Sequence, residues 1–404
     1  MLTTINNKHK KLNVPNIRFP EFSGEWNEEC LSDIADIHKG AGISKDQLSD
    51  EGESCILYGE LYTKYKSETI KEVISKTNID NTKLVRSKAN DVIIPCSGET
   101  AEDIATARCV LNDNILLGGD LNIIRLHGYD GSFISYQLNG KRKYDIAKVA
   151  QGVSVVHLYG EHLKGVKTVN PCLEEQQKIS KLLQLLDERI STQTKIIEDL
   201  KKLESAIIDY AINSLDTDFV KFGSLYEMAG EGGTPATSDA SFYDNGKIPF
   251  VKIEDLKQKY LTENKDFITE LGLQKSSAWL VPTRSILFSN GATIGEITIT
   301  TYPVCTKQGI LGIVPKQNID VEFLYYFMSS SYFKKAVSRI VTEGTMKTAY
   351  LKDINNILCP IPTKEEQQEI AKMPSVLNSK IDYEQSILEL FYAQKRYLLH
   401  QMFI

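Results

Sequence analysis

Hydrophobic residues in two segments of this chain recur mostly at spacings of three, four and seven, which is typical of one face of a long α-helix. The first segment follows Pro171, and the second follows Pro360 and Pro362, about 191 positions later. At that offset the apolar positions coincide. The coinciding pairs are Ile179 with Ile370, Leu182 with Met373, Leu186 with Leu377, Ile190 with Ile381, Ile197 with Leu388, Leu200 with Phe391 and Ile207 with Leu398. The pattern predicts two long amphipathic helices that pack on each other.

The residues before each helix show short apolar runs separated by Gly, Asn and Asp, which is typical of strands joined by turns. In the first half these runs are 54–58, 91–95, 115–117 and 121–126. Framework runs of the second half, at 222–228, 248–252 and 286–291, resemble 31–37, 55–59 and 92–98 of the first half. The rest of the two halves differs almost everywhere. We therefore expect two domains of one architecture that act on different targets.

The combined patterns predict an α+β fold in which two similar mixed α/β domains are separated by two long antiparallel helices, related by a pseudo-two-fold internal repeat. The predicted parts are an extended N-terminal segment at 1–24, a first domain at 25–170, a first spacer helix at 171–215, a second domain at 216–360 and a second spacer helix at 361–404. Pro374 lies near the start of the second helix, so a kink or a late start is expected there.

Composition places the chain among ordinary globular proteins, and its negative net charge limits how it can bind a polyanion such as nucleic acid. It has 404 residues, 42% of them hydrophobic and 25% charged, with a net charge of −6. None of the four main segments has a positive net charge, whereas a protein that binds DNA alone usually carries a basic patch. If this chain binds nucleic acid, most phosphate contacts should come from a partner. No run of residues approaches the roughly 20 apolar positions of a membrane span, and no signal peptide is evident, so we expect a cytoplasmic protein.

Motifs that carry chemistry are missing from the sequence. It contains no phosphate-binding GxxxxGK loop, no dinucleotide-binding GxGxxG after a strand, no GxSxG and no HExxH. The target-base motif [DN]PP[YFW] of amino-methyltransferases is also missing, and the acidic residues form no clear nuclease cluster. The seven cysteines are scattered and form no CxxC pair, which favours free buried thiols over a metal site. We therefore expect no catalytic residues and no metal ligands.

Several turns combine glycine with polar side chains that can form hydrogen bonds, as in GGTP at 232–235 and SNGAT at 289–293. Glycine allows the backbone to approach another surface closely, and Ser, Thr, Asn, Gln and Lys can contact base edges or phosphates. Any one such turn is also compatible with ordinary turn chemistry. Their recurrence in both halves favours binding.

Three features of the sequence recur together: the segment VPNIRFPEF at 14–22 with Gly24 and Trp26, the turn GGTP, and two helix starts in which proline precedes EEQQxI. In these features the sequence resembles the specificity (S) subunit of type I restriction-modification systems. The resemblance covers essentially the whole chain, including the order of domain, helix, domain, helix. Each motif alone is short, and their order and duplication make the match specific.

This resemblance implies a function and a set of partners. Each target-recognition domain would contact one half of a bipartite double-stranded DNA sequence through the major groove, and the paired helices would fix the gap between the halves. Two modification subunits would bind S-adenosylmethionine and methylate adenine, while restriction subunits would use ATP and Mg to translocate and cut DNA. The chain itself would hold no cofactor and catalyse no reaction.

Candidate DNA-contacting residues follow from loop position and hydrogen-bonding capacity. In the first domain they are Lys64, Ser97, Glu99, Thr100, Lys141, Arg142, Gln151, Ser154 and His157. In the second domain they are Lys252, Ser289, Asn290, Thr293, Lys307, Gln308, Thr345, Lys347 and Tyr350.

Two other classes of function compete with this prediction. A non-catalytic protein-interaction adaptor with two tandem binding domains would use the same loops to bind proteins, and it would retain no DNA even with a methylase present. A single-chain methyltransferase or nuclease would need a cofactor or catalytic motif that the sequence lacks. The adaptor is the stronger of the two alternatives.

Overall fold

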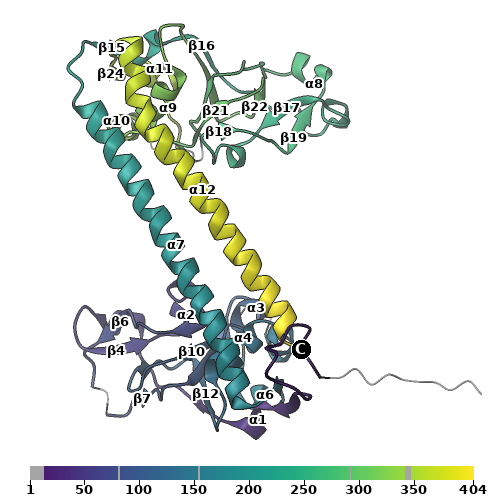
Figure 1. The fold of residues 1–404 in the computed structure, drawn as a ribbon. Coiled ribbons are helices and arrows are strands. Elements are labelled where there is room, and N and C mark those ends of the chain that lie inside the picture. Colours follow the sequence, from purple (N-terminus) through teal and green to yellow (C-terminus); the bar gives the residue numbers. More distant parts are fainter. Residues whose placement is uncertain (1–12, 81, 153–154, 292, 342–346) are drawn as a thin grey trace, which may run out of the picture. The chain divides into compact units, whose positions relative to one another are not determined.

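The computed structural model describes residues 13–404 apart from 81, 153–154, 292 and 342–346. The chain forms two compact units, one made of the residues up to Thr194 together with Ile387–Ile404, and the other made of Lys195–Ser386. Two long helices, α7 (Leu173–Asn213) and α12 (Lys364–Met402), each contribute one end to each unit (Figure 1).

The first unit is organised around a mixed sheet with the order β2-β12-β8-β10-β5. Neighbouring strands are antiparallel except for the parallel pair β10 and β5. The strands are β2 (Ala35–Lys39), β12 (Leu121–Leu126), β8 (Asp91–Pro95), β10 (Arg108–Val110) and β5 (Thr69–Ile70). All five residues of β8 are buried, as expected for a central strand with both faces covered.

A smaller sheet and several short elements complete the first unit. The smaller sheet has the order β3 (Leu48–Ser49), β6 (Ser75–Thr77), β4 (Glu53–Ile56), β11 (Leu116–Leu117) and β7 (Val85–Arg86). Two ladders pair β1 (Asn27–Cys30) with β14 (Lys167–Asn170) and β9 (Ser97–Gly98) with β13 (Val156–His157). The helices are α1 (Leu31–Ile34), α2 (Glu60–Thr63), α3 (Ala101–Ile104), α4 (Gly131–Asn139), α5 (Lys143–Val149) and α6 (Gly160–Lys164), with a 3-10 turn, η1, at Lys45–Gln47.

The second unit repeats this topology. Its main sheet has the order β16 (Tyr226–Glu231), β23 (Ile310–Pro315), β20 (Ile286–Ser289), β21 (Ile297–Thr300) and β18 (Tyr260–Leu261), again with one parallel pair at the β18 edge. A smaller sheet contains β19 (Asp266–Ile268), β17 (Ile248–Val251) and β22 (Cys305–Thr306), and β15 (Phe219–Lys221) pairs with β24 (Leu358–Pro360). The helices are α8 (Glu270–Gln274), α9 (Val321–Ser329), α10 (Ser331–Ile340) and α11 (Leu351–Ile354), with 3-10 turns η2 (Phe222–Ser224), η3 (Ala240–Phe242) and η4 (Ile253–Asp255).

Opposite ends of the two long helices pack on the core of each unit. In the first unit, Ile179 and Leu183 of α7 lie in the same apolar cluster as Leu399 and Met402 of α12. In the second unit, Ile208 and Ile212 of α7 share a cluster with Ile370 and Ala371 of α12. The start of one helix thus meets the end of the other in each unit, which is the antiparallel arrangement that the repeat predicted.

The first glutamine of each EEQQ motif joins its long helix to the globular domain beside it. Gln176 accepts a hydrogen bond from the backbone N–H of Asp130 (3.0 Å) and donates one to the carbonyl of Pro171 (2.9 Å). Gln367 makes the same two bonds with Asp320 (2.8 Å) and Pro362 (2.9 Å). Asp130 and Asp320 are the N-caps of α4 and α9, so the motif recurs because it positions a capped helix in each unit.

The described part of the N-terminal segment packs against the ends of both long helices in the first unit. Arg18 forms two 2.7 Å contacts with the carboxylate of Glu175, the second acidic residue of the first EEQQ motif. Trp26 is buried and its ring meets that of Phe133 edge-on at 5.7 Å between centroids. Arg18 and Trp26 of this segment therefore have a structural role.

The predicted element bounds agree closely with the structure in several places and fail at one. The strands β8 and β12 have the predicted limits, and the helix α12 (Lys364–Met402) lies within the predicted 361–404. Of the two alternatives expected at Pro374, a kink or a late start, the late start is wrong, because α12 begins at Lys364 and continues through that proline. Proline removes one N–H donor and crowds the carbonyl four residues earlier, and the burial of Pro374 in the second unit offsets this cost.

Candidate nucleic-acid interface

Three loops of the first unit meet where strand β8 ends. The residue after the strand is Cys96, whose N–H donates to the carbonyl of Asp120 (2.8 Å) and whose carbonyl accepts from the N–H of Leu158 (2.8 Å). These two bonds bring residues 97–100, 118–120, 151–152 and 155–159 together, and we refer to them as the first loop cluster.

Three loops of the second unit meet in the same way where β20 ends. Here Asn290 takes the place of Cys96: its N–H donates to the carbonyl of Gly309 (3.0 Å), and its carbonyl accepts from the N–H of Ala349 (2.9 Å). The Asn290 side chain adds a hydrogen bond to the carbonyl of Ala349 (3.3 Å). Residues 293–296, 307–309 and 347–350 form the second loop cluster. Equivalent backbone bonds thus build an equivalent surface in each unit.

A glycine at the end of the edge strand allows each cluster to close. The N–H of Gly40 donates to the carbonyl of Leu121 (2.9 Å), and the N–H of Gly232 donates to the carbonyl of Ile310 (2.9 Å). A Cβ atom on Gly40 would lie 2.0 Å from the carbonyl oxygen of Gly118, and one on Gly232 would lie 2.2 Å from that of Thr306. The first glycine of the GGTP turn is therefore required by close backbone packing.

The structure brings together several of the residues predicted in the first domain. Ser97 and His157 are paired across β9 and β13, and Gln151 exchanges two backbone hydrogen bonds with His157 (2.9 and 2.7 Å). The side chains of Glu99, Gln151 and His157 are exposed. Thr100 is exposed too, but it accepts from the N–H of Asp103 (3.0 Å) as the N-cap of α3. Ser154 lies outside the described residues.

Two of the basic residues predicted in the first domain, Lys64 and Arg142, have protein partners. Lys64 contacts the carboxylate of Glu60 (2.7 Å) and the hydroxyl of Ser75 (2.6 Å). Arg142 donates to the backbone carbonyl of Ile404 (3.4 Å), so it holds the end of the chain. Lys141 is exposed in the turn between α4 and α5. Neither Lys141 nor Arg142 belongs to the first loop cluster.

A cleft of about 1030 Å³ adjoins the first loop cluster and includes Lys64 in its lining. The wall is shared by residues of η1, α2 and the loop that enters β12. Its lining consists of Gly42, Ile43, Ser44, Lys45, Gln47, Leu48, Leu57, Tyr58, Gly59, Glu60, Thr63, Lys64, Gly118, Gly119 and Asp120. The lining contains Glu60 and Asp120 as well as Lys45 and Lys64, so the cleft is not purely basic.

Two residues predicted in the second domain are buried within the fold. Ser289 and Asn290 are 0% and 1% exposed. The Ser289 hydroxyl accepts from the N–H of Glu296 (2.8 Å) and donates to the carbonyl of Thr293. Their polar groups form hydrogen bonds that hold the loops in place. Direct contact of Ser289 and Asn290 with DNA stays a prediction.

The exposed positions of the second loop cluster are Thr293, Lys307, Gln308, Lys347 and Tyr350. The backbone N–H groups beside them are fixed by side chains of the edge-strand turn, since Gln308 donates to the hydroxyl of Thr234 (3.4 Å) and Gly309 donates to the carboxylate of Glu231 (2.9 Å).

Lys252 follows Val251, whose carbonyl accepts from the N–H of Lys307 in that cluster (2.9 Å). The ammonium of Lys252 pairs with Asp266 at 2.8 Å. The hydrogen bond from Asp266 raises the pKa of Lys252 above its ordinary value. Thr345 lies outside the described residues.

Sequence analysis overlooked three residues beside the first cluster. Lys39, at the end of β2, acts electrostatically on the Cys96 thiol. Tyr159 is 54% exposed in the first loop cluster, and its ring stacks on that of His157 at 6.2 Å. Tyr58 is 40% exposed and lines the cleft. Aromatic faces of this kind stack on bases and sugars. Their closeness to glycine turns in the sequence is the signal that could have identified them.

Reactive groups are not gathered at either cluster. Burial raises the pKa of the Cys55, Cys96 and Cys305 thiols to about 11, so they remain protonated and unreactive at neutral pH. Within the part of the chain that the structure describes, no group of three His, Cys, Asp or Glu residues could hold a metal ion. Across the same residues, no helix combines the length and apolar character needed to cross a membrane.

Comparison with known proteins assigns both halves to one domain type. Residues 23–202 and 215–390 each match the family described as "Type I restriction modification DNA specificity domain". The MjaIX specificity subunit of Methanocaldococcus jannaschii is 32% identical over 173 residues, which are 41% of this chain and 39% of that protein. The putative MjaX specificity subunit of the same organism is 23% identical over an alignment covering 97% of this chain and 96% of the relative. The chain thus spans about two fifths of one relative and nearly all of the other.

Solved structures show the same fold. The S subunit of a type I restriction-modification system from M. genitalium has a TM-score of 0.60 at 17% identity, covering 97% of this chain and 99% of that one. A chain from a study of complex assembly in the type I R-M system has a TM-score of 0.56 at 14% identity, covering 94% and 97%. From its duplicated domains, its equivalent loop clusters and the family match in both halves, this chain belongs to the type I restriction-modification DNA specificity family.

Proposed function

We propose that this chain is the sequence-specific DNA-binding specificity subunit of a type I restriction-modification complex. The observation that carries the proposal is the duplicated loop cluster: Cys96 and Asn290 make the same pair of backbone bonds, and each lies in a half that matches a DNA specificity domain. Each cluster presents exposed polar side chains on glycine-containing loops, which is the chemistry that contacts base edges and phosphates in a groove. Each target-recognition domain, at 25–170 and 216–360, contacts one half of a bipartite DNA target.

The charge of the chain indicates how the complex holds DNA. With a net charge of −6, and with Lys64, Arg142 and Lys252 engaged by protein groups, the chain supplies few free cations for phosphate contacts. Two modification subunits supply most of these contacts by closing around the duplex. Relatives named as specificity subunits, and a similar chain from a study of complex assembly, support this arrangement.

Catalysis belongs to the partners in this proposal. Modification subunits bind S-adenosylmethionine and methylate adenine, and restriction subunits use ATP and Mg. This chain holds no cofactor and directs both activities to the target in the cytoplasm. The protein-interaction adaptor has no comparable support, because both halves match a domain named for DNA specificity.

The two long helices set the length of the gap between the half-sites. Each is an uninterrupted helix of 41 or 39 residues, and an α-helix rises about 1.5 Å per residue. Adding or deleting one turn of about four residues within 180–210 should change the gap and leave both half-sites intact. A changed half-site with an unchanged gap would contradict this role of the helices.

The direct test is modification-sensitive sequencing of genomic DNA from cells that express the cognate modification subunit with and without this chain. New methyl-adenine that depends on the chain, in one motif with two short halves and a fixed gap, is the expected result. A stable complex with the modification subunit that yields no methylation and retains no DNA would contradict the proposal and favour an adaptor.

A further inference from the structure

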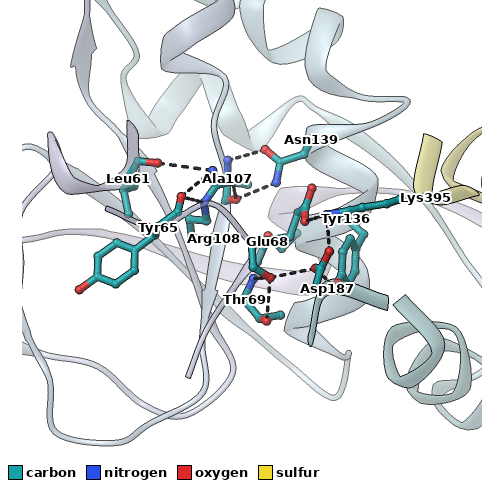
Figure 2. A network of polar contacts seen from close by, with 12 residues as sticks. Leu61, Tyr65, Glu68, Thr69, Ala107, Arg108, Tyr136, Asn139, Asp187 and Lys395 are labelled. Atoms are coloured by element: carbon teal, nitrogen blue, oxygen red, sulfur yellow. Dashed lines mark hydrogen bonds and ion pairs between the residues drawn. The ribbon is translucent and has the colours of Figure 1, made fainter. Parts of the chain in front are cut away.

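A buried ion cluster fixes the end of α12 to the first domain (Figure 2). The ammonium of Lys395 contacts the carboxylates of Glu68 (2.5 Å) and Asp187 (2.6 Å). The three side chains are 13%, 13% and 8% exposed. Asp187 lies on α7 and also accepts a hydrogen bond from the hydroxyl of Tyr136 (2.7 Å). One lysine of α12 therefore neutralises two carboxylates inside the first unit.

The second unit has a buried ion cluster at the same place in its fold. The ammonium of Lys259 is 3% exposed and pairs with Glu322 of α9. It also donates to the hydroxyls of Tyr326 (2.8 Å) and Ser375 (3.0 Å). Tyr326 occupies the position in α9 that Tyr136 occupies in α4, six residues after the capping aspartate.

Glu68 and Lys259 are structurally equivalent residues with opposite charges. The carbonyl of Glu68 accepts from the N–H of Cys109 on β10 (2.8 Å), and the carbonyl of Lys259 accepts from the N–H of Ile299 on β21 (2.8 Å). Each residue directly precedes the edge strand that pairs in parallel with that neighbour. The duplicated domains thus carry a carboxylate in one copy and an ammonium in the other.

Their partners on the long helices are inverted as well. The helix repeat of 191 residues places Glu204 of α7 at the position of Lys395 in α12. Glu204 lines one hollow of the second unit together with Tyr326, whose hydroxyl accepts a hydrogen bond from Lys259 (2.8 Å). Burial raises the pKa of Glu204, and the nearby charge of Lys259 lowers it. In the first unit, the domain carries the carboxylate (Glu68) and the helix end carries the ammonium (Lys395). In the second unit, the domain carries the ammonium (Lys259) and the helix end carries the carboxylate (Glu204).

Apolar packing does not distinguish the two helix ends. Leu399 of α12 and Phe403, which directly follows that helix, enter the core of the first unit, and the equivalent Ile208 and Ile212 of α7 enter that of the second. Both ends present large aliphatic or aromatic groups at the same spacing. Either end has the side chains to cover either domain, and two copies of the chain can in principle exchange these ends.

We propose that the inverted pairs Glu68–Lys395 and Lys259–Glu204 prevent two copies of this chain from exchanging their helix ends. In an exchanged dimer, the first domain would receive Glu204 beside Glu68 and Asp187, and the second domain would receive Lys395 beside Lys259. Each of these two exchanged contacts would bury groups of like charge next to each other, which is strongly unfavourable. The charges select the intramolecular partner where the apolar surfaces do not.

The test reverses one pair and keeps the attraction between its two positions. In the full-length variant E68K/K395E, positions 68 and 395 remain opposite in charge, the lysine of this unit moves to position 68 beside the carboxylates at 395 and Asp187, and both exchanged contacts become attractive. Two differently tagged copies are unfolded and refolded together, and native mass spectrometry gives the fraction of mixed dimer. We expect the variant to form mixed dimer at a fraction on the order of ten-fold above that of the wild type.

Two further variants distinguish control of helix exchange by charge from a simple loss of stability. E28K/K167E reverses an exposed pair of the same unit, whose atoms are 2.6 Å apart, and should leave the dimer fraction unchanged. The second pair can be reversed as well by adding E204K/K259E to E68K/K395E. E322Q is included because it removes the carboxylate that pairs with Lys259 in the wild type. These changes make the exchanged contacts repulsive again and should restore the wild-type dimer fraction.

Equal mixed-dimer fractions in the wild type and E68K/K395E would overturn the proposal. If E68K/K395E does not refold, E204K/K259E/E322Q alone makes the same prediction from the other unit, and a wild-type dimer fraction there would overturn the proposal as well. Neither readout depends on DNA or on the proposed function.

Discussion

The first and second loop clusters share their backbone and differ in their side chains. Cys96 and Asn290 join the same strand end to the same two loops, yet the first cluster exposes Glu99, Gln151 and His157, whereas the second exposes Lys307, Gln308 and Lys347. One cluster carries an acidic and an imidazole group where the other carries two ammonium groups. The framework can therefore be copied unchanged while the contacting surface varies.

This difference explains why the two halves of the sequence match only in their framework runs. Backbone hydrogen bonds and close glycine packing tolerate few changes, but an exposed loop residue is constrained mainly by its target. Two domains of one architecture can therefore have separate DNA targets.

The largest effect is expected from K395E, which would leave three carboxylates in the first unit without an ammonium. Removing one partner of a buried ion pair costs about 3–5 kcal/mol. E204K should cost less in the second unit, because Lys259 keeps its pair with Glu322. Urea unfolding of each full-length variant measures both values. Equal losses would show that the two ion clusters are not organised differently.

A smaller effect is expected from G40A, which places a methyl group 2.0 Å from the carbonyl oxygen of Gly118. Overpacking of this kind costs about 1–3 kcal/mol, and it should weaken recognition of the first half-site. G42A is the matched control, because a Cβ at Gly42 meets no atom within 4 Å. Stability by urea unfolding and methylation of the target should stay unchanged in G42A. If G40A and G42A changed stability and methylation equally, close packing at Gly40 would not be the cause.

A still smaller effect is expected from N290A, which removes the side-chain hydrogen bond to Ala349 and keeps both backbone bonds of Asn290. One such bond contributes about 1 kcal/mol. N290C introduces the residue that the first unit uses and should behave like N290A in urea unfolding. A loss of several kcal/mol in either variant would show that the two loop clusters do not share a backbone-determined framework.

The smallest effect concerns pH. Burial alone would lower the pKa of Lys395, but the charges of Glu68 and Asp187 raise it above its ordinary value of 10.5. A raised folded-state pKa means that this lysine contributes its full stabilisation below pH 10.5 and loses it as pH rises through the folded pKa. The stability difference between the wild type and K395M should therefore be constant from pH 6 to 9 and shrink above pH 10.5. A difference that changes near neutral pH would assign the titration to another group.

The repeat and the apolar patterns predicted most of the architecture. Strands 91–95 and 121–126 were predicted with their observed limits, and the helix at 364–402 was predicted within a few residues, at 361–404. Each of these elements combines an apolar pattern with clear turn or proline signals. The role of Gln176 and Gln367 was also accessible, because a polar residue repeated at a helix start suggests a cap contact.

Other features depend on contacts that no local pattern contains. Ser289 and Asn290 lie in a glycine-containing turn, and such residues can point outward or inward; here they are buried. Lys395 meets Glu68 across 327 positions of the chain. The ladder between β9 and β13 has two residues per strand, which is too short to produce a recognisable period.

The central claim is that each loop cluster contacts its own half of one DNA target. The most direct measurement is modification-sensitive sequencing of cells that express the modification subunit with Q151A/H157A in one culture and Q308A/K347A in another. The account predicts that the first variant relaxes positions in one half-site and the second relaxes positions in the other, with the gap unchanged in both. Relaxation of the same half-site by both variants, or an unaltered motif and methylation level in both, would contradict it.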